Sequence, residues 1–90
     1  MAKKLSFAPS FKKDYQKLPK DIQKKLDKQL RFLSDNPKHP SLKIHRLGSA
    51  GLYWEFYIDR FYRGIFRISE DAYELLFAGT HKLIDRWTDI

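Results

Sequence analysis

The sequence predicts an α+β fold in which two N-terminal helices pack on one face of a mainly antiparallel sheet of four to five strands. Three observations predict it. Residues 52–68 alternate as a β-hairpin does, residues 9–35 contain two helical stripes of apolar side chains, and residues 72–79 form an apolar run with the length of a buried strand. The expected order of elements is βααββββ, a common two-layer arrangement.

The N-terminal part is expected to hold a short strand over residues 3–7 and two helices. Apolar side chains at helical spacing begin at Phe11. Pro19 ends this first helix, because proline disfavours helical geometry in the residue before it, and it can open the second. The second helix should end near residues 35–37. Its expected buried stripe is Ile22, Leu26, Leu30 and Leu33.

The remaining elements follow from alternation and turn residues. Residues 41–47 alternate apolar with basic side chains and are expected to form a strand, and residues 48–51 turn the chain into the hairpin. Residues 69–71 make the next turn. The apolar residues 72–79 should form a strand in the middle of the sheet, and Thr80 could cap a short final helix.

The hairpin is the most informative stretch, because a slip of one residue would exchange its two faces. A two-residue turn would set Arg63 beside Phe56 and bury a charge without a partner, which costs several kcal/mol. We therefore expect a three-residue connection over residues 59–61. The resulting cross-strand pairs are Phe56–Gly64 and Trp54–Phe66 on the core side and Tyr57–Arg63 and Tyr53–Arg67 on the open side.

This register predicts one dry face and one basic face that carries tyrosines. The even-numbered residues should face the core, namely Leu52, Trp54, Phe56, Ile58, Tyr62, Gly64, Phe66 and Ile68. Arg63 and Arg67 lie in mid-strand on the other face, where a charge is unfavourable unless it is paired or used. A cross-strand salt bridge with Glu55 would be an ordinary structural explanation, and we expect it for Arg67 more than for Arg63.

Length, charge and cysteine content limit the functions that the chain can have. Ninety residues are expected to make one domain, 1–90, without a membrane span or a secretion signal. The absence of cysteine fits the reducing cytoplasm. The formal charge is +7, and residues 1–31 hold ten Lys and Arg against three Asp. Such a chain attracts nucleic acid or an acidic protein, although solvated lysines on helices explain part of the excess.

Motifs for metal or nucleotide binding are missing: the sequence has no glycine-rich phosphate loop, no Cys/His cluster and no HExxH pattern. His39 lies between prolines and is expected to be a solvated loop residue. His45 is on the open side of its strand. His81 lies just past the end of an expected central strand, where polar side chains converge, and there a functional role and a structural hydrogen bond are equally good explanations. Trp87 could pack a terminal helix or stack on a base.

Four runs, NPKHPSLKIHRL, GLYWEFYI, YRGIFRI and LLFAGTH, occur in this order and resemble the RelE/ParE superfamily of bacterial and archaeal toxins, in particular its RelE/YafQ-like members. The resemblance covers nearly the whole chain. Its most telling parts are the YRxxF motif around Arg63 and the G-x-H pattern that ends at His81. It implies a toxin of a type II toxin–antitoxin system, held in a hetero-oligomer by a cognate antitoxin protein.

For most RelE-type members the resemblance further implies a ribosome-dependent mRNA endonuclease, or mRNA interferase, that binds mRNA in the ribosomal A site. The RNA's own 2′-hydroxyl is the nucleophile, and neither a metal nor a cofactor takes part. On the matching positions, Arg63 would stabilise charge on the scissile phosphate, and His81 and His45 would transfer protons. The residues expected to hold the RNA are Lys43, Arg46, Arg67, Tyr53, Tyr57 and Trp87.

Two points leave alternatives open: this sequence departs from RelE in one strand, and ParE-type members of the superfamily have a different function. RelE has a pair of lysines in the strand before its arginine, and here those positions fall on Trp54 and Phe56, or on Glu55 and Tyr57. This predicts a histidine-assisted mechanism rather than one identical to RelE's. ParE-type members share the fold but inhibit DNA gyrase without known nuclease chemistry. A gyrase-directed toxin and an inactive toxin-like binding domain are therefore the alternatives.

Overall fold

The computed structural model describes residues 4–48 and 51–84. The elements in chain order are β1 (Lys4–Phe7), α1 (Pro9–Lys17), α2 (Lys20–Asp35), the 3₁₀ helix η1 (Pro40–Leu42), β2 (His45–Leu47), β3 (Tyr53–Tyr57), β4 (Tyr62–Ile68), β5 (Ala72–Thr80) and α3 (His81–Ile84). The strands form one sheet in the order β1-β5-β4-β3-β2, in which β1 and β5 are parallel and the other neighbours are antiparallel. None of the helices in the described ranges has the length and apolar character needed to cross a membrane.

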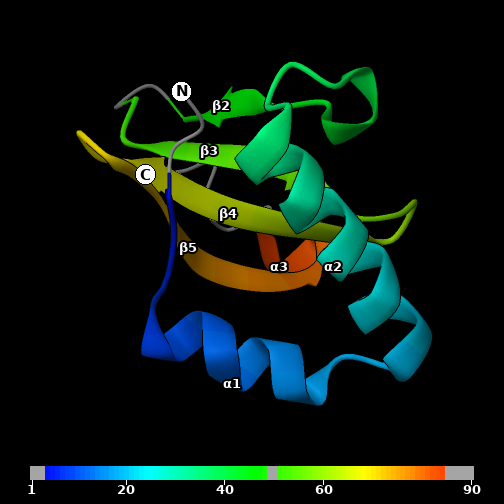
Figure 1. Ribbon diagram of the computed structural model, residues 1–90. Coiled ribbons are helices and arrows are strands. Elements are labelled where there is room, and N and C mark those ends of the chain that lie inside the picture. Colours follow the sequence, from blue (N-terminus) through cyan, green and yellow to red (C-terminus); the bar gives the residue numbers. More distant parts are fainter. Residues whose placement is uncertain (1–3, 49–50, 85–90) are drawn as a thin grey trace.

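Figure 1 shows α1 and α2 on one face of the sheet and α3 on the other, which we call the open face. The predicted α+β fold, with two N-terminal helices over one face of a mainly antiparallel sheet, is confirmed. The main core lies between these helices and the sheet, and its buried residues include Leu26, Leu33, Phe56, Phe66 and Leu75.

The bounds of the first two helices follow from local sequence. Pro9 opens α1, and Leu18 ends it in an extended conformation, as expected for the residue before Pro19. In α2, three of the four predicted stripe residues are buried, whereas Leu30 is only half-buried. Gln29 is buried instead, with 4% of its surface exposed.

Helix α1 also covers the edge of β5 that the short β1 leaves bare. Strand β1 pairs only with the first part of β5, up to Leu75. Beyond that point, the Ser10 hydroxyl donates to the carbonyl of Leu76 at 2.5 Å, and the Asp14 carboxylate accepts from the amide of Ala78 at 3.0 Å. Ser10 and Asp14 lie one helical turn apart on the same face of α1, so the helix continues the hydrogen bonding of the sheet edge.

The predicted register of the hairpin is confirmed. Phe56 pairs with Gly64, Trp54 with Phe66 and Tyr57 with Arg63. The fully buried Phe56 ring lies over Gly64, and a Cβ atom on Gly64 would be only 2.3 Å from the ring carbons. Any larger residue at this position would force the buried Phe56 ring to shift. The β3–β4 ladder ends at Trp54–Phe66, so the predicted pair Tyr53–Arg67 lies outside it.

The strand predicted over residues 41–47 is wrong in its first half. Residues 40–42 form η1, Lys43 adopts a left-handed conformation with φ 46°, and only residues 45–47 form β2. Pro40 favours the first turn of a helix, and the His39 ring accepts a hydrogen bond from the backbone amide of Ser41 at 3.2 Å. This local capping overrides the alternating pattern.

Two further expectations about the faces need correction. Leu52 and Ile68, predicted to face the core, are 56% and 44% exposed, because they lie at the ends of the hairpin arms farthest from its turn. The open face is also not purely polar, since Leu47, Ile65 and Ile84 form a second buried cluster there, with Ile84 contributed by α3.

A β-bulge in β5 supplies part of the second cluster. Ile65 of β4 pairs with Phe77 but Phe66 pairs with Leu75, which leaves Leu76 as an extra residue. A bulge interrupts the alternation of side chains along a strand. As a result Leu76 and Phe77, which are adjacent in sequence, both pack against the second cluster.

Candidate functional site

The open face carries a group of polar side chains near the turn end of the hairpin, which we call the open-face cluster: Lys43, His45, Glu55, Tyr57 and Arg63. Lys43 follows η1, and the other four come from β2, β3 and β4. In the sheet, His45 lies opposite Glu55 and Tyr57 lies opposite Arg63. Strand alternation then places all four strand residues on one face.

Arg63 is held by several partners at once. Its Nη1 donates to the backbone carbonyls of Asp59 and Tyr62, the latter at 2.9 Å. Its Nε lies 3.7 Å from Oε1 of Glu55, and its guanidinium carbon lies 4.8 Å from the centre of the Tyr57 ring. The side chain is 23% exposed. The guanidinium is thus fixed in position while part of the side chain stays accessible.

The salt bridge of Glu55 was predicted for the wrong arginine. The direct partner of Glu55 across the hairpin is Ile65, so Arg63 and Arg67 are its two diagonal neighbours on β4. Arg67 instead pairs with Glu74, its direct neighbour on β5, and remains 51% exposed. With Arg67 engaged by the adjacent strand, Glu55 contacts Arg63.

His45 is bound on both ring nitrogens. Its Nδ1 lies 3.1 Å from the backbone carbonyl oxygen of Lys43, and its Nε2 lies 3.3 Å from Oε1 of Glu55. Both partner atoms are acceptors, so the ring can donate to both only when both of its nitrogens are protonated. The same oxygen of Glu55 contacts Arg63, and the Glu55 side chain is only 12% exposed. One carboxylate oxygen therefore joins two predicted catalytic residues.

Tyr57 links the cluster to the rest of the fold. Two cations lie over its ring: Nζ of Lys43 at 4.6 Å and the guanidinium carbon of Arg63 at 4.8 Å from the ring centre. Its backbone carbonyl accepts a hydrogen bond of 2.7 Å from the side-chain amide of Gln29, which also donates to the carbonyl of Ser41 at 3.1 Å. Helix α2 thereby holds η1 and β3 together beneath the cluster.

His81 lies at the same end of the sheet as Arg63. Its backbone amide donates to the carbonyl of Phe61 at 2.9 Å, and Gly79, two residues earlier, is the ladder partner of Arg63. The side chain is exposed at the start of α3. Among the residues that the structure describes, no hydrogen bond or ion pair is found for its ring. His81 is therefore next to the cluster but not joined to it.

The other predicted RNA-binding residues lie apart from the cluster. Arg46 is on the opposite face, where its guanidinium carbon lies 4.9 Å from the centre of the Trp54 ring. Tyr53 packs against the second buried cluster beneath α3. Arg67 is on the open face but at the far end of β4. Trp87 lies outside the described residues.

Two polar residues of this region were not predicted as part of a site. The sequence predicts Glu55 as a salt-bridge partner and as one position that could replace a lysine of RelE, whereas the structure places it between two candidate residues. Asp59 shapes the loop, because its Oδ1 accepts from the amides of Phe61 and Tyr62 at 2.8 and 3.0 Å. An Asp at the start of a short loop is the sequence signal for such a turn. Among the described residues, no three His, Asp or Glu side chains are grouped so that they could hold a metal ion.

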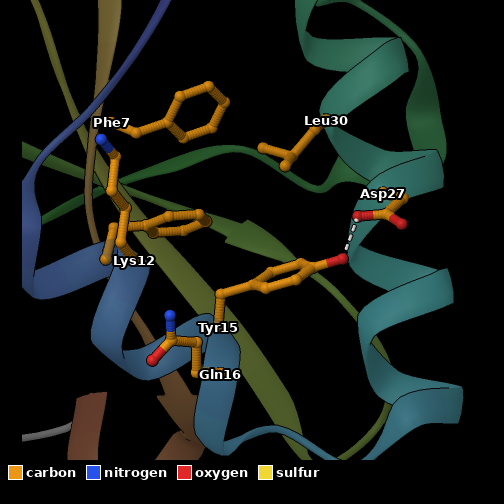
Figure 2. Close-up of a pocket in the computed structure, with 7 residues that line it drawn as sticks. Phe7, Lys12, Tyr15, Gln16, Asp27 and Leu30 are labelled. Carbon is orange, nitrogen blue, oxygen red and sulfur yellow. Dashed lines mark hydrogen bonds between the residues drawn. The ribbon is translucent and has the colours of Figure 1, made fainter.

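A groove of about 410 Å³ lies between α1 and α2 (Figure 2). The residues that line it are Phe7, Phe11, Lys12, Tyr15, Gln16, Asp27 and Leu30. The Tyr15 hydroxyl donates to Asp27 at 2.9 Å and joins the two helices across the groove, as Figure 2 shows. This hydrogen bond, together with smaller effects of burial and of the Asp27 charge, raises the pKa of the Tyr15 phenol. Phe7 is 40% exposed at one side, so the groove presents apolar surface to the solvent.

Comparison with known proteins shows what this arrangement is similar to. No protein-family model and no curated protein matches the sequence. Among solved structures, the DinJ–YafQ toxin–antitoxin complex of E. coli matches with a TM-score of 0.76 and 19% identity, over 93% of this chain and 98% of that chain. The YoeB/ParE toxin from Agrobacterium tumefaciens matches with a TM-score of 0.71 and 24% identity, over 87% and 98%.

A third match is the archaeal RelE–RelB complex from Pyrococcus horikoshii OT3, with a TM-score of 0.72 and 16% identity, over 89% of this chain and 96% of that chain. All three likenesses extend over most of both chains. They agree with the element order and with the sheet described above. The chain therefore has the fold of the RelE/YafQ-like toxins of toxin–antitoxin systems.

Proposed function

We propose that this protein is the toxin of a toxin–antitoxin pair and acts as an endoribonuclease on mRNA in the ribosomal A site. The observation that carries the proposal is the open-face cluster, in which Arg63, His45 and Lys43 converge at the turn end of the hairpin. An arginine already fixed by carbonyl groups and a carboxylate needs little reorganisation to stabilise charge that develops on a phosphate. The likeness to toxins in fold supports the toxin role.

In the proposed reaction the 2′-oxygen of the RNA attacks the adjacent phosphorus. A bond forms between the 2′-oxygen and phosphorus, and the bond from phosphorus to the 5′-oxygen breaks. The proton of the 2′-hydroxyl passes to a general base, and a general acid protonates the leaving 5′-oxygen. Arg63 faces the non-bridging oxygens, and His45 and His81 are the proton-transfer candidates. The products carry a 2′,3′-cyclic phosphate, or the 3′-phosphate formed by its hydrolysis, and a 5′-hydroxyl.

The positions of the basic residues suggest where RNA would run. Lys43 and Tyr57 are the proposed contacts next to Arg63. Arg67 lies four residues farther along the same strand, about 13 Å away at the rise of a β-strand, and would contact a more distant phosphate. Arg46 lies on the opposite face of the edge strand β2, so RNA would have to pass around that edge to reach it.

We infer that the antitoxin places an acidic, amphipathic segment in the groove between α1 and α2. The groove is lined by apolar surface, and Lys12 lies at its margin. The N-terminal third that forms these helices carries most of the excess positive charge. An apolar face would bind Phe7 and Leu30, and acidic side chains would face Lys12.

The variant Leu30→Glu tests this docking surface. Leu30 is half-buried and packs against the main core, so circular dichroism first checks that the variant is folded. Its carboxylate would repel an acidic segment. Co-expressed with the product of the neighbouring gene, the parent should co-purify with it and the variant should not. A parent chain that is harmless when expressed alone and co-purifies with no neighbouring product contradicts the antitoxin proposal.

Mapping of mRNA ends by primer extension after induction tests the nuclease proposal. Site-specific cuts in translated message are expected. Intact message together with DNA damage would instead assign the protein to the gyrase-directed class of toxins. Intact message without DNA damage would indicate a binding domain that lacks toxin activity. Cleavage is expected to need no divalent metal beyond what the ribosome itself requires.

A further inference from the structure

Glu55 occupies a position that a phosphate-binding site would be expected to avoid. Its Oε1 lies 3.3 Å from Nε2 of His45 and 3.7 Å from Nε of Arg63. A carboxylate at this place repels phosphate and neutralises part of the charge that attracts RNA. The side chain is 12% exposed, so the negative charge is held inside the cluster rather than in the surrounding solvent.

The rest of the open face offers a contrasting carboxylate. Glu74 pairs with Arg67 on the same face, and its side chain is 31% exposed. No contact between Glu74 and a histidine is found within the described ranges, whereas Glu55 contacts both His45 and Arg63. Substitutions at the two glutamates therefore separate the effect of the carboxylate charge on RNA binding from the effect of Glu55 on the orientation of His45.

We propose that Glu55 is a positioning residue that weakens the binding of RNA to the open-face cluster and at the same time holds His45 in the orientation needed for cleavage. The second half of this proposal rests on the proposed nuclease function. The first half rests only on the charge and position of the carboxylate.

The effect on orientation follows from how His45 is held. Its side chain is 57% exposed, and within residues 4–48 and 51–84 the ring is bound only by the Lys43 carbonyl and by Glu55. Without the carboxylate, one of these two contacts is lost and the ring can turn toward solvent. Arg63 would keep its hydrogen bonds to the carbonyls of Asp59 and Tyr62. The loss of Glu55 should therefore affect proton transfer more than the placement of the guanidinium.

Two variants separate the two roles. Glu55→Ala removes both the charge and the contact with His45. We expect it to bind RNA about two- to fivefold more tightly, the range that a partly exposed ion pair is worth, and to cleave at least about tenfold more slowly. Glu55→Asp keeps the charge but is one methylene shorter. It should bind RNA as the parent does and still cleave at least about tenfold more slowly.

The matched control is Glu74→Ala. It removes the partner of Arg67 on the same face, and within the described ranges Glu74 contacts no histidine. We expect it to bind RNA more tightly, as Glu55→Ala does, and to cleave at the parent rate. If the alanine variant fails to fold, RNA binding is measured instead with Glu55→Gln, whose side chain has nearly the volume of the parent glutamate.

Binding is measured by fluorescence anisotropy with a short RNA that carries 2′-O-methyl groups throughout and so cannot react. Cleavage is measured in single turnovers on ribosome-bound mRNA. Glu55→Ala that binds no more tightly than the parent, or Glu55 variants that cleave at the parent rate, would overturn the proposal. A parent protein that cleaves no mRNA would refute the nuclease function and with it the orientation role, and the anisotropy measurement would then decide the charge role alone.

Discussion

The main core beneath α1 and α2 and the open-face cluster hold their side chains by different means. Beneath α1 and α2, Phe56, Phe66 and Leu75 are fully buried and packed by apolar neighbours. On the open face, Glu55 and Arg63 remain partly exposed and are ordered by ion pairs and hydrogen bonds. The first arrangement stabilises the fold, and the second fixes charged groups where a ligand can reach them. Substitutions on the two faces should therefore affect different quantities.

The open face itself contains a second contrast. Arg63 and Arg67 lie on the same strand and the same face, and each has a glutamate partner. Arg63 also binds two backbone carbonyls and the Tyr57 ring and is 23% exposed, whereas Arg67 is 51% exposed. Only Arg63 is held in one position by several partners at once. This is why the proposed chemistry is assigned to the turn end of the hairpin.

The largest effect is expected for His81→Ala. If this exposed histidine transfers a proton, cleavage of ribosome-bound mRNA should fall about 10²- to 10⁴-fold. The free energy of unfolding should stay close to that of the parent, because the side chain lies outside both buried clusters. A folded variant that cleaves at the parent rate would exclude His81 and leave His45 as the candidate.

Arg63→Ala should lower cleavage by about 10²- to 10³-fold, the usual effect of removing one group that stabilises transition-state charge. Arg67→Ala is the matched control on the same strand, and we expect it to change cleavage only a few-fold. If the two variants lowered cleavage equally, the two ends of β4 would not differ in their contribution to cleavage, contrary to the proposal. A fully toxic Arg63→Ala protein would instead favour the gyrase-directed function.

Gly64→Ala tests the other face. The new methyl group would lie 2.3 Å from the buried Phe56 ring, so overpacking should lower the free energy of unfolding by about 1–3 kcal/mol. Urea unfolding measures this change. Gly79→Ala is the control, since its Cβ would be 3.3 Å from the end of the exposed Leu83 side chain, which can move aside. A Gly64→Ala protein as stable as Gly79→Ala would show that the Phe56 ring can move aside at little cost.

The smallest effect is expected for Tyr15→Phe, which removes the hydrogen bond to Asp27 that joins α1 and α2. Because the bond is exposed, the loss of stability near neutral pH should stay below about 1 kcal/mol. The raised pKa of Tyr15 means that the folded protein holds the phenol proton more tightly than the unfolded chain does. The stabilisation is therefore present below the ordinary value of 10.0 and is lost as the pH rises above it.

Unfolding free energies of the parent and of Tyr15→Phe, measured near neutral pH and above pH 10, check this sign. The difference between the two proteins should shrink on the alkaline side. A difference that grows with pH would contradict the described hydrogen bond.

The sequence by itself determined most of the elements and the register of the hairpin. The spacing of apolar side chains can be read from neighbouring residues alone, and the prolines at positions 9 and 19 mark where α1 and α2 begin. The cost of burying Arg63 was enough to choose the odd-length loop and so to predict the pair Phe56–Gly64. The same register predicted that Tyr57 and Arg63 share one face, and the alternation of residues 41–47 placed His45 on the open side of its own strand.

Only the tertiary structure decided which of these residues meet. Glu55 has two diagonal arginine neighbours, and the choice of Arg63 depends on Glu74 from another strand, which engages Arg67. The contact between His45 and Glu55 likewise depends on how β2 docks after η1, a segment in which local capping overrode the alternating pattern. Periodicity assigns each residue to a face, but contacts between strands depend on pairing, bulges and capping that involve residues distant in the sequence.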